Sequence, residues 1–128
     1  MTEEKVRILW ADDEADFVEP ISFWLRSKGY EVLTVPNGRE AVLSVKENLP
    51  DILFLDLSMP VMSGLEALKE IRSFNKDLPV IMVSAAYKNE NWVTDAKGLG
   101  ISGFFSKSYP FDQLTQIIHV ALRTHKKL

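Results

Sequence analysis

Short apolar segments of strand length alternate with longer amphipathic segments along the chain, and this alternation constrains the fold more than any other feature. The apolar segments cover residues 6–11, 31–35, 51–55, 79–83 and 102–106. Nearly continuous apolar strands are typical of a parallel sheet that helices cover on both faces. The sequence therefore predicts an α/β fold with a doubly wound, five-stranded parallel sheet and helices on both of its faces.

The amphipathic segments predict five helices, of which the last three are expected at about 64–74, 89–99 and 111–124. Pro20 lies inside the first helical pattern and predicts either a kink or a late start of the regular helix. The fourth pattern contains several weak helix formers, so we expect marginal stability there. The apolar positions expected on the inner helix faces are Phe17, Ile21, Trp24, Leu25, Ala41, Val42, Val45, Leu49, Leu65, Leu68, Ile71, Leu114, Ile117, Ile118, Ala121 and Leu122.

Length and composition exclude several classes of protein. The 128 residues suit one domain, 1–128, with a core expected over about 5–124. The chain contains no cysteine, and its net charge of −3 argues against direct binding of nucleic acid. The charged start without a long apolar stretch predicts neither a signal peptide nor a membrane span. We therefore expect a soluble, cytoplasmic domain.

Five polar residues fall at or just after the ends of predicted strands: Asp12, Asp13, Asp56, Ser84 and Lys107. The carboxyl ends of parallel strands meet at one edge of a sheet, so these side chains are expected to converge. Carboxylates at buried strand ends are costly to desolvate, and a cluster of them needs a cation. Oxygen ligands without histidine or thiolate favour Mg²⁺ or a similar ion.

Each of these residues also has a simpler interpretation. Asp12 and Asp13 could cap the first helix, and Asp56 could be an ordinary turn residue. Lysines are mostly exposed, so Lys107 could be solvated, and a serine at a strand end such as Ser84 is commonplace. Their joint placement at one edge of one sheet favours a functional site over these separate roles.

Four segments of the chain resemble the receiver domain of two-component response regulators, including the chemotaxis regulators. They are residues 8–14 (ILWADDE), 51–64 (DILFLDLSMPVMSG), 79–85 (PVIMVSA) and 104–107 (FFSK). One such segment is a weak motif, but four in the right order, each at a strand, form a specific signal. The resemblance covers about residues 7–122 and implies a flavodoxin-like fold with the strand order 2-1-3-4-5.

The resemblance also implies a site chemistry. Asp56 would accept a phosphoryl group from a phosphohistidine donor. The metal ligands would be Asp12, Asp13, Asp56 and the backbone carbonyl of Ser58, and the ion would be Mg²⁺ or Mn²⁺. Lys107 would pair with the phosphate, so the positive charge of the metal and the lysine would balance the three carboxylates.

A conformational switch is implied by the same resemblance. The Ser84 hydroxyl would follow the phosphate, and the Phe104 ring would turn into the space that it leaves. The surface of the fourth helix, fifth strand and fifth helix would then change. Phe104 could instead be plain core, because strand alternation places Phe104 and Phe105 on opposite faces. Trp92 could be core or could face a partner.

The sequence departs from the family pattern at two places. The family usually has proline directly after the lysine, whereas Lys107 is followed by Ser108 and Tyr109, with proline only at Pro110. A cis bond after Lys107 is therefore not expected, while a cis bond before Pro110 stays open. Ser84 stands where threonine is common, and its hydroxyl should be less restrained because it lacks the methyl group.

Three other functions remain as alternatives. A degenerate receiver would act only as a docking module. A Mg²⁺-dependent phosphohydrolase with an aspartate nucleophile would carry a second aspartate two residues after it, where this chain has Ser58. A flavodoxin-like cofactor binder would need a phosphate loop after the first strand, where Asp12 and Asp13 would repel phosphate.

The preferred interpretation is a signalling switch that catalyses its own phosphorylation and dephosphorylation and is not a turnover enzyme. Its expected partners are a sensor histidine kinase or a phosphotransfer protein, and an unknown output domain or protein. A phosphorylation-dependent dimer is also possible.

Overall fold

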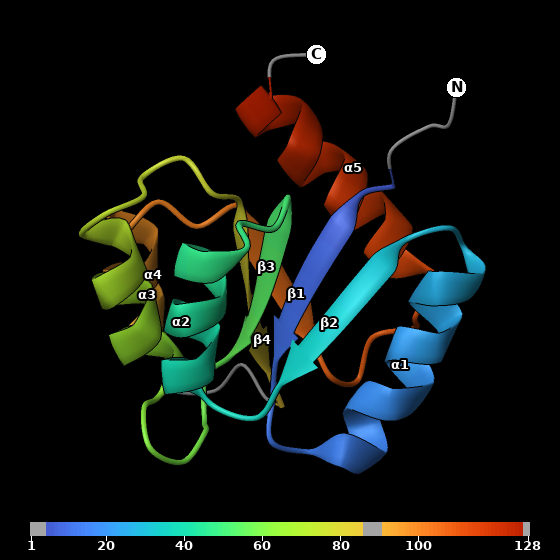
Figure 1. Cartoon of the computed structure of the whole chain (residues 1–128), viewed down its shortest axis with the longest axis horizontal. Coiled ribbons are helices and arrows are strands. Elements are labelled where there is room, and N and C mark those ends of the chain that lie inside the picture. The colour runs from blue at the N-terminus through green and yellow to red at the C-terminus, as the bar shows by residue number, and fades with distance from the viewer. Residues whose placement is uncertain (1–4, 86–90, 127–128) are drawn as a thin grey trace.

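The computed structural model describes residues 5–85 and 91–126, in which strands and helices alternate along the chain (Figure 1). The elements are β1 Arg7–Ala11, α1 Ala15–Ser27, β2 Glu31–Val35, α2 Gly38–Glu47, β3 Ile52–Asp56, α3 Gly64–Arg72, β4 Val80–Ser84, α4 Asn91–Gly98, β5 Gly103–Ser106 and α5 Gln113–Lys126. Every expected strand and helix is present, and the boundaries within the described residues differ from the expected ones by a few residues. The expected start of the fourth helix, residues 89–90, lies outside the described residues.

The sheet has the order β2-β1-β3-β4-β5, and all four strand pairs are parallel. The predicted topology is therefore confirmed. The chain goes from β1 outward to β2 and then returns to the other side of β1 as β3, so the strand order reverses between β1 and β3. In parallel sheets, ligands bind outside the carboxyl ends of the strands at such a reversal.

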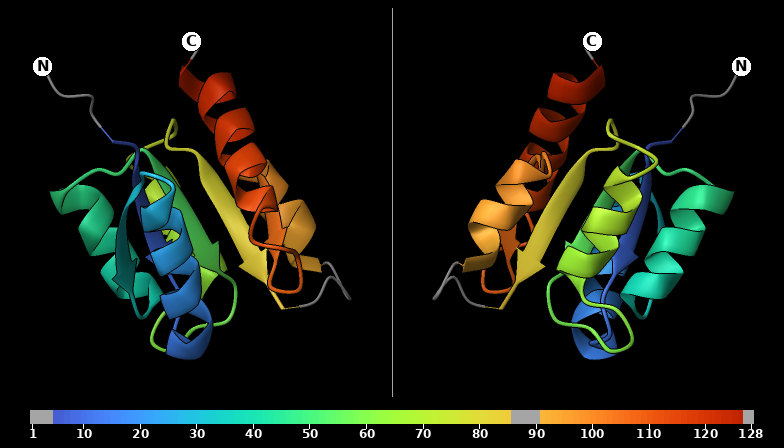
Figure 2. Two further views of the ribbon diagram at one scale, coloured as in Figure 1. Left: turned by 90° about the vertical axis from the view of Figure 1, so that its right-hand side faces the viewer. Right: turned by 90° about the vertical axis from the view of Figure 1, so that its left-hand side faces the viewer.

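Helices cover the sheet on both faces, as the edge-on views show: α1 and α5 lie on one face, and α2, α3 and α4 on the other (Figure 2). The strands supply alternate residues to the two cores, which explains their nearly continuous apolar sequences. On the α1 and α5 face, the rings of Trp10 and Phe54 stack with centroids 4.4 Å apart, and Phe105 meets Trp10 edge-on. This aromatic cluster fills the core beneath the ends of β1 and β3.

The helices differ from the expectations in two instructive places. Helix α1 begins at Ala15 and runs through Pro20, so the predicted late start is wrong. The carbonyl left without a helical donor belongs to Asp16 in the exposed first turn, where water can reach it. Leu49 does not belong to the core; it follows the end of α2 and is 51% exposed.

The loop between β3 and α3 is held tightly against the sheet. A Cβ atom at Gly64 would lie 2.1 Å from the backbone oxygen of Asp56, so only glycine fits where α3 begins. The Gly64 amide donates to the carbonyl of Leu57, and Ser63 and Glu66 form a reciprocal capping box. These contacts fix the path of the chain directly after Asp56.

Gly64→Ala is expected to lower the free energy of unfolding by about 2–3 kcal/mol, because backbone atoms must move to accept the methyl group. The matched control is Gly98→Ala at the end of α4, where an added Cβ meets nothing within 4 Å. The control should gain up to about 1 kcal/mol from better helix propensity. Urea denaturation measures both values. Equal stability of the two variants would contradict the close approach of α3 to β3.

Candidate functional site

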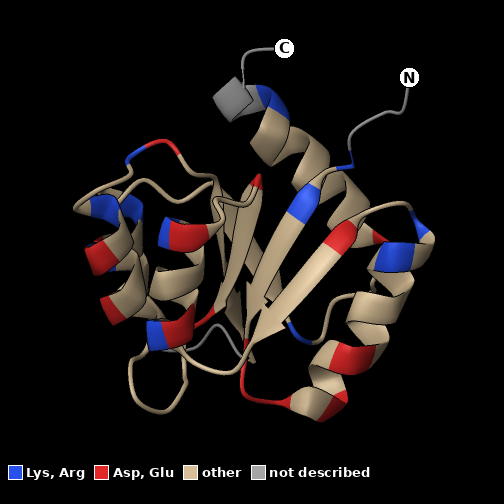
Figure 3. Ribbon diagram, in the orientation of Figure 1, with Lys and Arg blue, Asp and Glu red and all other residues tan. Residues whose placement is uncertain are grey.

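Three carboxylates converge where the strand order reverses. Asp12 follows β1 and Asp56 ends β3, and both are buried, whereas Asp13 is exposed. The two strands are direct neighbours, with Ala11 opposite Leu55. Each of the three aspartates offers an oxygen within 4.8 Å of the others. Figure 3 shows acidic segments of the ribbon gathered at this edge, around the chain that leaves β1.

The cluster has the chemistry that a hard cation requires. Asp12 Oδ1 accepts a hydrogen bond from the Glu14 amide at 2.9 Å, which orients the carboxylate. Asp12 Oδ2 is buried and accepts no hydrogen bond from the described residues, although an ammonium lies 3.1 Å away. A buried carboxylate with one oxygen that accepts no hydrogen bond, in a cluster with Asp13 and Asp56, suits an ion such as Mg²⁺.

That ammonium belongs to Lys107, which follows β5 and reaches across the ends of β4 and β3. Its Nζ lies 3.1 Å from Asp12 and 3.6 Å from Asp56, and it also hydrogen-bonds Glu14. The Phe17 ring centroid is 4.9 Å away. Burial alone would lower the pKa of Lys107, but its contacts with Glu14, Asp56 and Asp12 outweigh burial and raise it. The ammonium is therefore charged and well held.

The electrostatics of Asp56 differ from those of an ordinary carboxyl. Burial, followed by the charge of Asp12, raises the pKa of Asp56 to about 7, with smaller contributions from Asp13 and Glu14. The positive charge of Lys107 acts in the opposite direction. One lysine thus compensates only part of the negative charge, and a divalent cation would supply the remainder.

A cavity of about 300 Å³ opens at this edge of the sheet. Its walls are formed by Asp13, Glu14, Asp56, Leu57, Ser58, Ser84, Ala85 and Lys107. Ser84 ends β4, the strand beside β3, so its side chain reaches the same cavity as the Asp56 carboxylate. The structure thus brings Asp13, Asp56, Ser84 and Lys107 to one cavity, and Asp12 belongs to the adjoining carboxylate cluster. The roles of these residues stay predictions. The carbonyl of Ser58 as a ligand stays a prediction.

Phe104 lies outside that cavity. It is half-buried on β5, and the ring of Trp92 on α4 meets it edge-on with centroids 5.3 Å apart. Phe105 points to the opposite face and is fully buried, as strand alternation requires. Trp92 therefore packs against the protein's own β5. The role of Phe104 as a switch stays a prediction.

The simpler interpretations of the acids and the lysine are wrong. The N-cap of α1 is Glu14, whose side chain makes no capping hydrogen bond, so neither Asp12 nor Asp13 caps that helix. The Lys107 side chain is only 12% exposed and is not solvated. Asp56 lies inside β3 at its last position and not in a turn.

The loop after Lys107 differs in sequence from the family pattern, and hydrogen bonds hold its conformation. The Ser106 hydroxyl accepts a hydrogen bond from the Ser108 amide and lies 2.8 Å from the Ser108 hydroxyl, while the Tyr109 amide donates to the Ser106 carbonyl. Within residues 5–85 and 91–126 no peptide bond is cis, so the bond before Pro110 is trans. A hydrogen-bonded serine turn therefore holds this loop.

Two residues of the site were missed from the sequence. Glu14 and Phe17 both contact the Lys107 ammonium. Glu14 had a visible signal, since it extends the acidic pair at the end of the first strand. Phe17 had none, because its place in the amphipathic pattern of α1 indicates only core packing.

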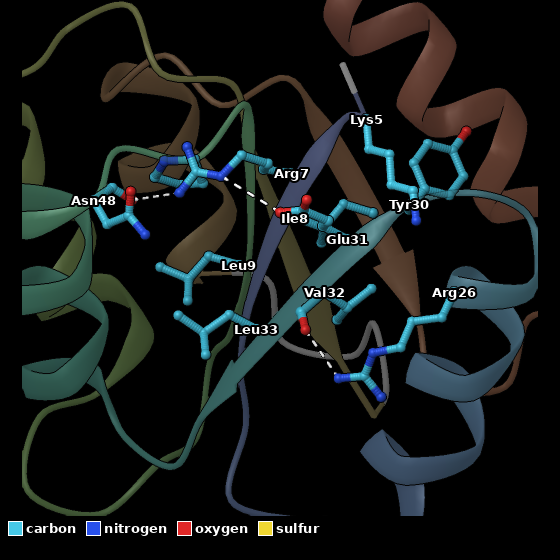
Figure 4. A pocket seen from close by; sticks show the side chains of 11 residues that line it. Lys5, Arg7, Ile8, Leu9, Arg26, Tyr30, Glu31, Val32, Leu33 and Asn48 are labelled. Atoms are coloured by element: carbon cyan, nitrogen blue, oxygen red, sulfur yellow. Dashed lines mark hydrogen bonds and ion pairs between the residues drawn. The ribbon is translucent and has the colours of Figure 1, made fainter. Parts of the chain in front are cut away.

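A second cavity, of about 420 Å³, lies at the opposite end of the sheet beside β2 (Figure 4). Both arginines of this cavity have backbone partners. Arg7 donates to the carbonyl of Leu49. Arg7 also donates to the carbonyl of Asn48, and Arg26 donates to that of Val32 (Figure 4). These bonds tie Arg7 to the connection from α2 to β3 and Arg26 to the edge strand β2, which favours a structural role. Within the described part of the chain, no helix is long and apolar enough to cross a membrane.

Comparison with known proteins agrees with this geometry. A family model described as the response regulator receiver domain matches residues 8–119. The transcriptional regulatory protein ZraR of Klebsiella oxytoca is 34% identical over 128 residues, which are 100% of this chain and 28% of that protein. The transcriptional regulatory protein PrrA of Mycobacterium bovis is 32% identical over 117 residues, 91% of this chain and 50% of that protein.

A solved structure has the same organisation. The receiver domain of the Francisella response regulator 1452 superposes with a TM-score of 0.83 at 27% identity, covering 94% of this chain and 99% of that chain. This chain spans half or less of the length of ZraR and PrrA, but nearly all of the isolated receiver. The chain belongs to the receiver domain family of two-component response regulators.

Proposed function

We propose that Asp56 is the phosphoacceptor and that the chain takes a phosphoryl group from a phosphohistidine on a sensor kinase or phosphotransfer protein. The observation that carries this proposal is the meeting of three carboxylates and the Lys107 ammonium around one cavity at the carboxyl ends of the strands. Phosphoryl transfer needs little more than alignment and neutralisation of charge, and this set provides both.

The site residues divide the chemistry among them. A carboxylate oxygen of Asp56 forms the new bond to phosphorus as the bond from phosphorus to the donor nitrogen breaks, and the imidazole leaves with the electron pair. Lys107 neutralises the transferred oxygens, and the Ser84 hydroxyl donates to one of them. Asp12, Asp13 and Asp56, with the Ser58 carbonyl, would hold Mg²⁺ or Mn²⁺, which supplies positive charge to the phosphoryl oxygens.

Mass spectrometry after treatment with acetyl phosphate and Mg²⁺ tests the proposal. Wild type is expected to gain one phosphoryl group, and Asp56→Asn none, because the amide lacks the nucleophilic oxygen. Asp112→Asn, an exposed aspartate before α5, is the matched control and should behave as wild type. Equal labelling of Asp56→Asn and wild type would place the acceptor elsewhere. No Mg²⁺-dependent labelling of wild type would favour a docking module.

Phosphorylation is proposed to change the surface formed by α4, β5 and α5. The new phosphate would attract the Ser84 hydroxyl, and the ring of Phe104 would turn away from Trp92 into the vacated space. Inverting a 1:99 population takes about 5.5 kcal/mol, which a few charge-assisted hydrogen bonds can supply. Amide chemical shifts before and after phosphorylation measure the change. An unaltered spectrum over β5 and α5 would exclude the switch.

The output, the oligomeric state and the location of the protein are also proposals. ZraR and PrrA are described as transcriptional regulatory proteins and are longer than this chain, which supports control of a separate output domain or protein. Dimerisation on phosphorylation and a cytoplasmic location fit the same role. Turnover of p-nitrophenyl phosphate would instead favour a phosphohydrolase, although Ser58 stands where that class carries its acid.

A further inference from the structure

The Lys107 ammonium lies between two kinds of acid. Asp12 and Asp56 hold it from the buried side, whereas Glu14 approaches it from the solvent side with a side chain that is 59% exposed. Glu14 also lines the wall of the cavity. Its own backbone is fixed, because its amide donates to Asp12 and its carbonyl accepts from the amides of Phe17 and Val18 in α1. The backbone of Glu14 is therefore held in place, which keeps its side chain beside the Lys107 ammonium.

This placement has a consequence for the phosphoryl group. Lys107 must turn toward oxygens attached to Asp56, but in the resting protein it hydrogen-bonds Glu14. We propose that Glu14 is a positioning residue that holds the Lys107 ammonium at the mouth of the cavity, and that the phosphoryl group must displace it. Glu14 thereby slows phosphorylation of the resting protein while leaving the acceptor chemistry intact. The inference rests on the proposed function of Asp56.

Removing Glu14 does not leave the lysine without support. The Phe17 ring lies 4.9 Å from Nζ on the α1 side, and Asp12 and Asp56 remain within 3.6 Å. An ammonium over an aromatic ring is held by the ring's negative face. The ammonium therefore stays in the cavity and becomes free to bind the incoming phosphoryl group, so the expected effect is faster phosphorylation.

The rate of Asp56 phosphorylation by acetyl phosphate at saturating Mg²⁺ tests the inference. Glu14→Gln is expected to raise this rate about threefold to fivefold, the range for release of one partly exposed ion pair. Asp16→Asn is the matched control: it removes the same charge from the first turn of α1, and among the described residues Asp16 is not a partner of Lys107. The control should change the rate less than twofold.

A spectroscopic measurement separates competition from a merely structural role. In the resting protein, Glu14→Gln should shift the ¹⁵N ammonium resonance of Lys107, and in the phosphorylated protein the same variant should leave it unchanged. An unchanged or slower rate in Glu14→Gln, or equal acceleration in Asp16→Asn, would overturn the inference. So would a Lys107 resonance that does not move in the resting variant.

The failure of the proposed function has a different signature. If wild type takes up no phosphoryl group at Asp56, the acceptor assignment is overturned, and the role of Glu14 as a competitor falls with it. The ¹⁵N ammonium resonance of Lys107, compared between wild type and Glu14→Gln in the resting state, then still shows whether Glu14 contacts the lysine. Labelling of Asp56 in wild type without any effect of Glu14→Gln overturns only the inference.

Discussion

Replacing Arg72 with alanine is expected to lower the free energy of unfolding by about 3–5 kcal/mol, because the change removes the donors from four carbonyls that are partly or fully buried. Arg72 is the last residue of α3 and is only 5% exposed. Burial lowers the pKa of its guanidinium, and the charge of Asp77 opposes that effect in part. Its charge is satisfied mainly by backbone oxygens.

The guanidinium joins two loops that are far apart in the sequence. It donates to the carbonyls of Leu99 at 2.7 Å, Leu78 at 2.8 Å, Asn75 at 3.0 Å and Gly100 at 3.1 Å. Asn75 and Leu78 belong to the connection from α3 to β4, and Leu99 and Gly100 to the connection from α4 to β5. Arg72 therefore ties the start of two neighbouring strands to the end of α3.

Two variants make the test specific. Arg72→Lys keeps the charge, but a single ammonium cannot span four carbonyls, so it should recover less than half of the loss. Arg26→Ala is the matched control, because this exposed arginine donates to one carbonyl, that of Val32, and should cost about 1 kcal/mol at most. Urea denaturation measures all three. Equal losses for Arg72→Ala and Arg26→Ala would show that the carbonyl network contributes little.

The features predicted from the sequence are those that short-range patterns determine. Strand-length apolar segments predicted all five strands. The signal is strongest for β1, β3 and β4, which are buried on both faces and are therefore continuously apolar. The site followed from one rule, that acids placed after neighbouring parallel strands meet at one edge of the sheet. Asp12, Asp13 and Asp56 needed only that rule and the strand order, and the order itself came from the resemblance.

The features that were missed depend on contacts between distant segments. Arg72 lies in an amphipathic helix pattern, and its four carbonyl partners are set by two loops whose paths no local signal reveals. Phe17 reaches Lys107 only because α1 and the loop after β5 lie on the same side of the sheet. Leu49 fits the helical period of α2, but the helix ends two residues earlier. The apolar periodicity of the sequence therefore extends beyond the end of the helix.

In the absence of a divalent cation, Asp56→Asn is expected to be more stable than wild type by about 2–4 kcal/mol at pH 8. Burial raises the pKa of Asp56 to about 7, so at pH 8 the folded protein contains a charged, buried carboxylate. That charge destabilises the folded state. Asparagine has nearly the same shape without the charge. Urea denaturation in a chelator at several pH values measures the difference.

The raised pKa of Asp56 determines how the stability of wild type changes with pH. The folded state holds the Asp56 proton up to about pH 7, while the unfolded chain releases it near pH 4. The stability of wild type should therefore fall as the pH rises between these values, and the advantage of Asp56→Asn should shrink toward zero near pH 4. Saturating Mg²⁺ should reverse the order at pH 8, because the ion stabilises wild type through the carboxylate that the variant lacks. An Asp56→Asn variant less stable than wild type in chelator at pH 8 would mean that Lys107 alone already compensates the buried charge.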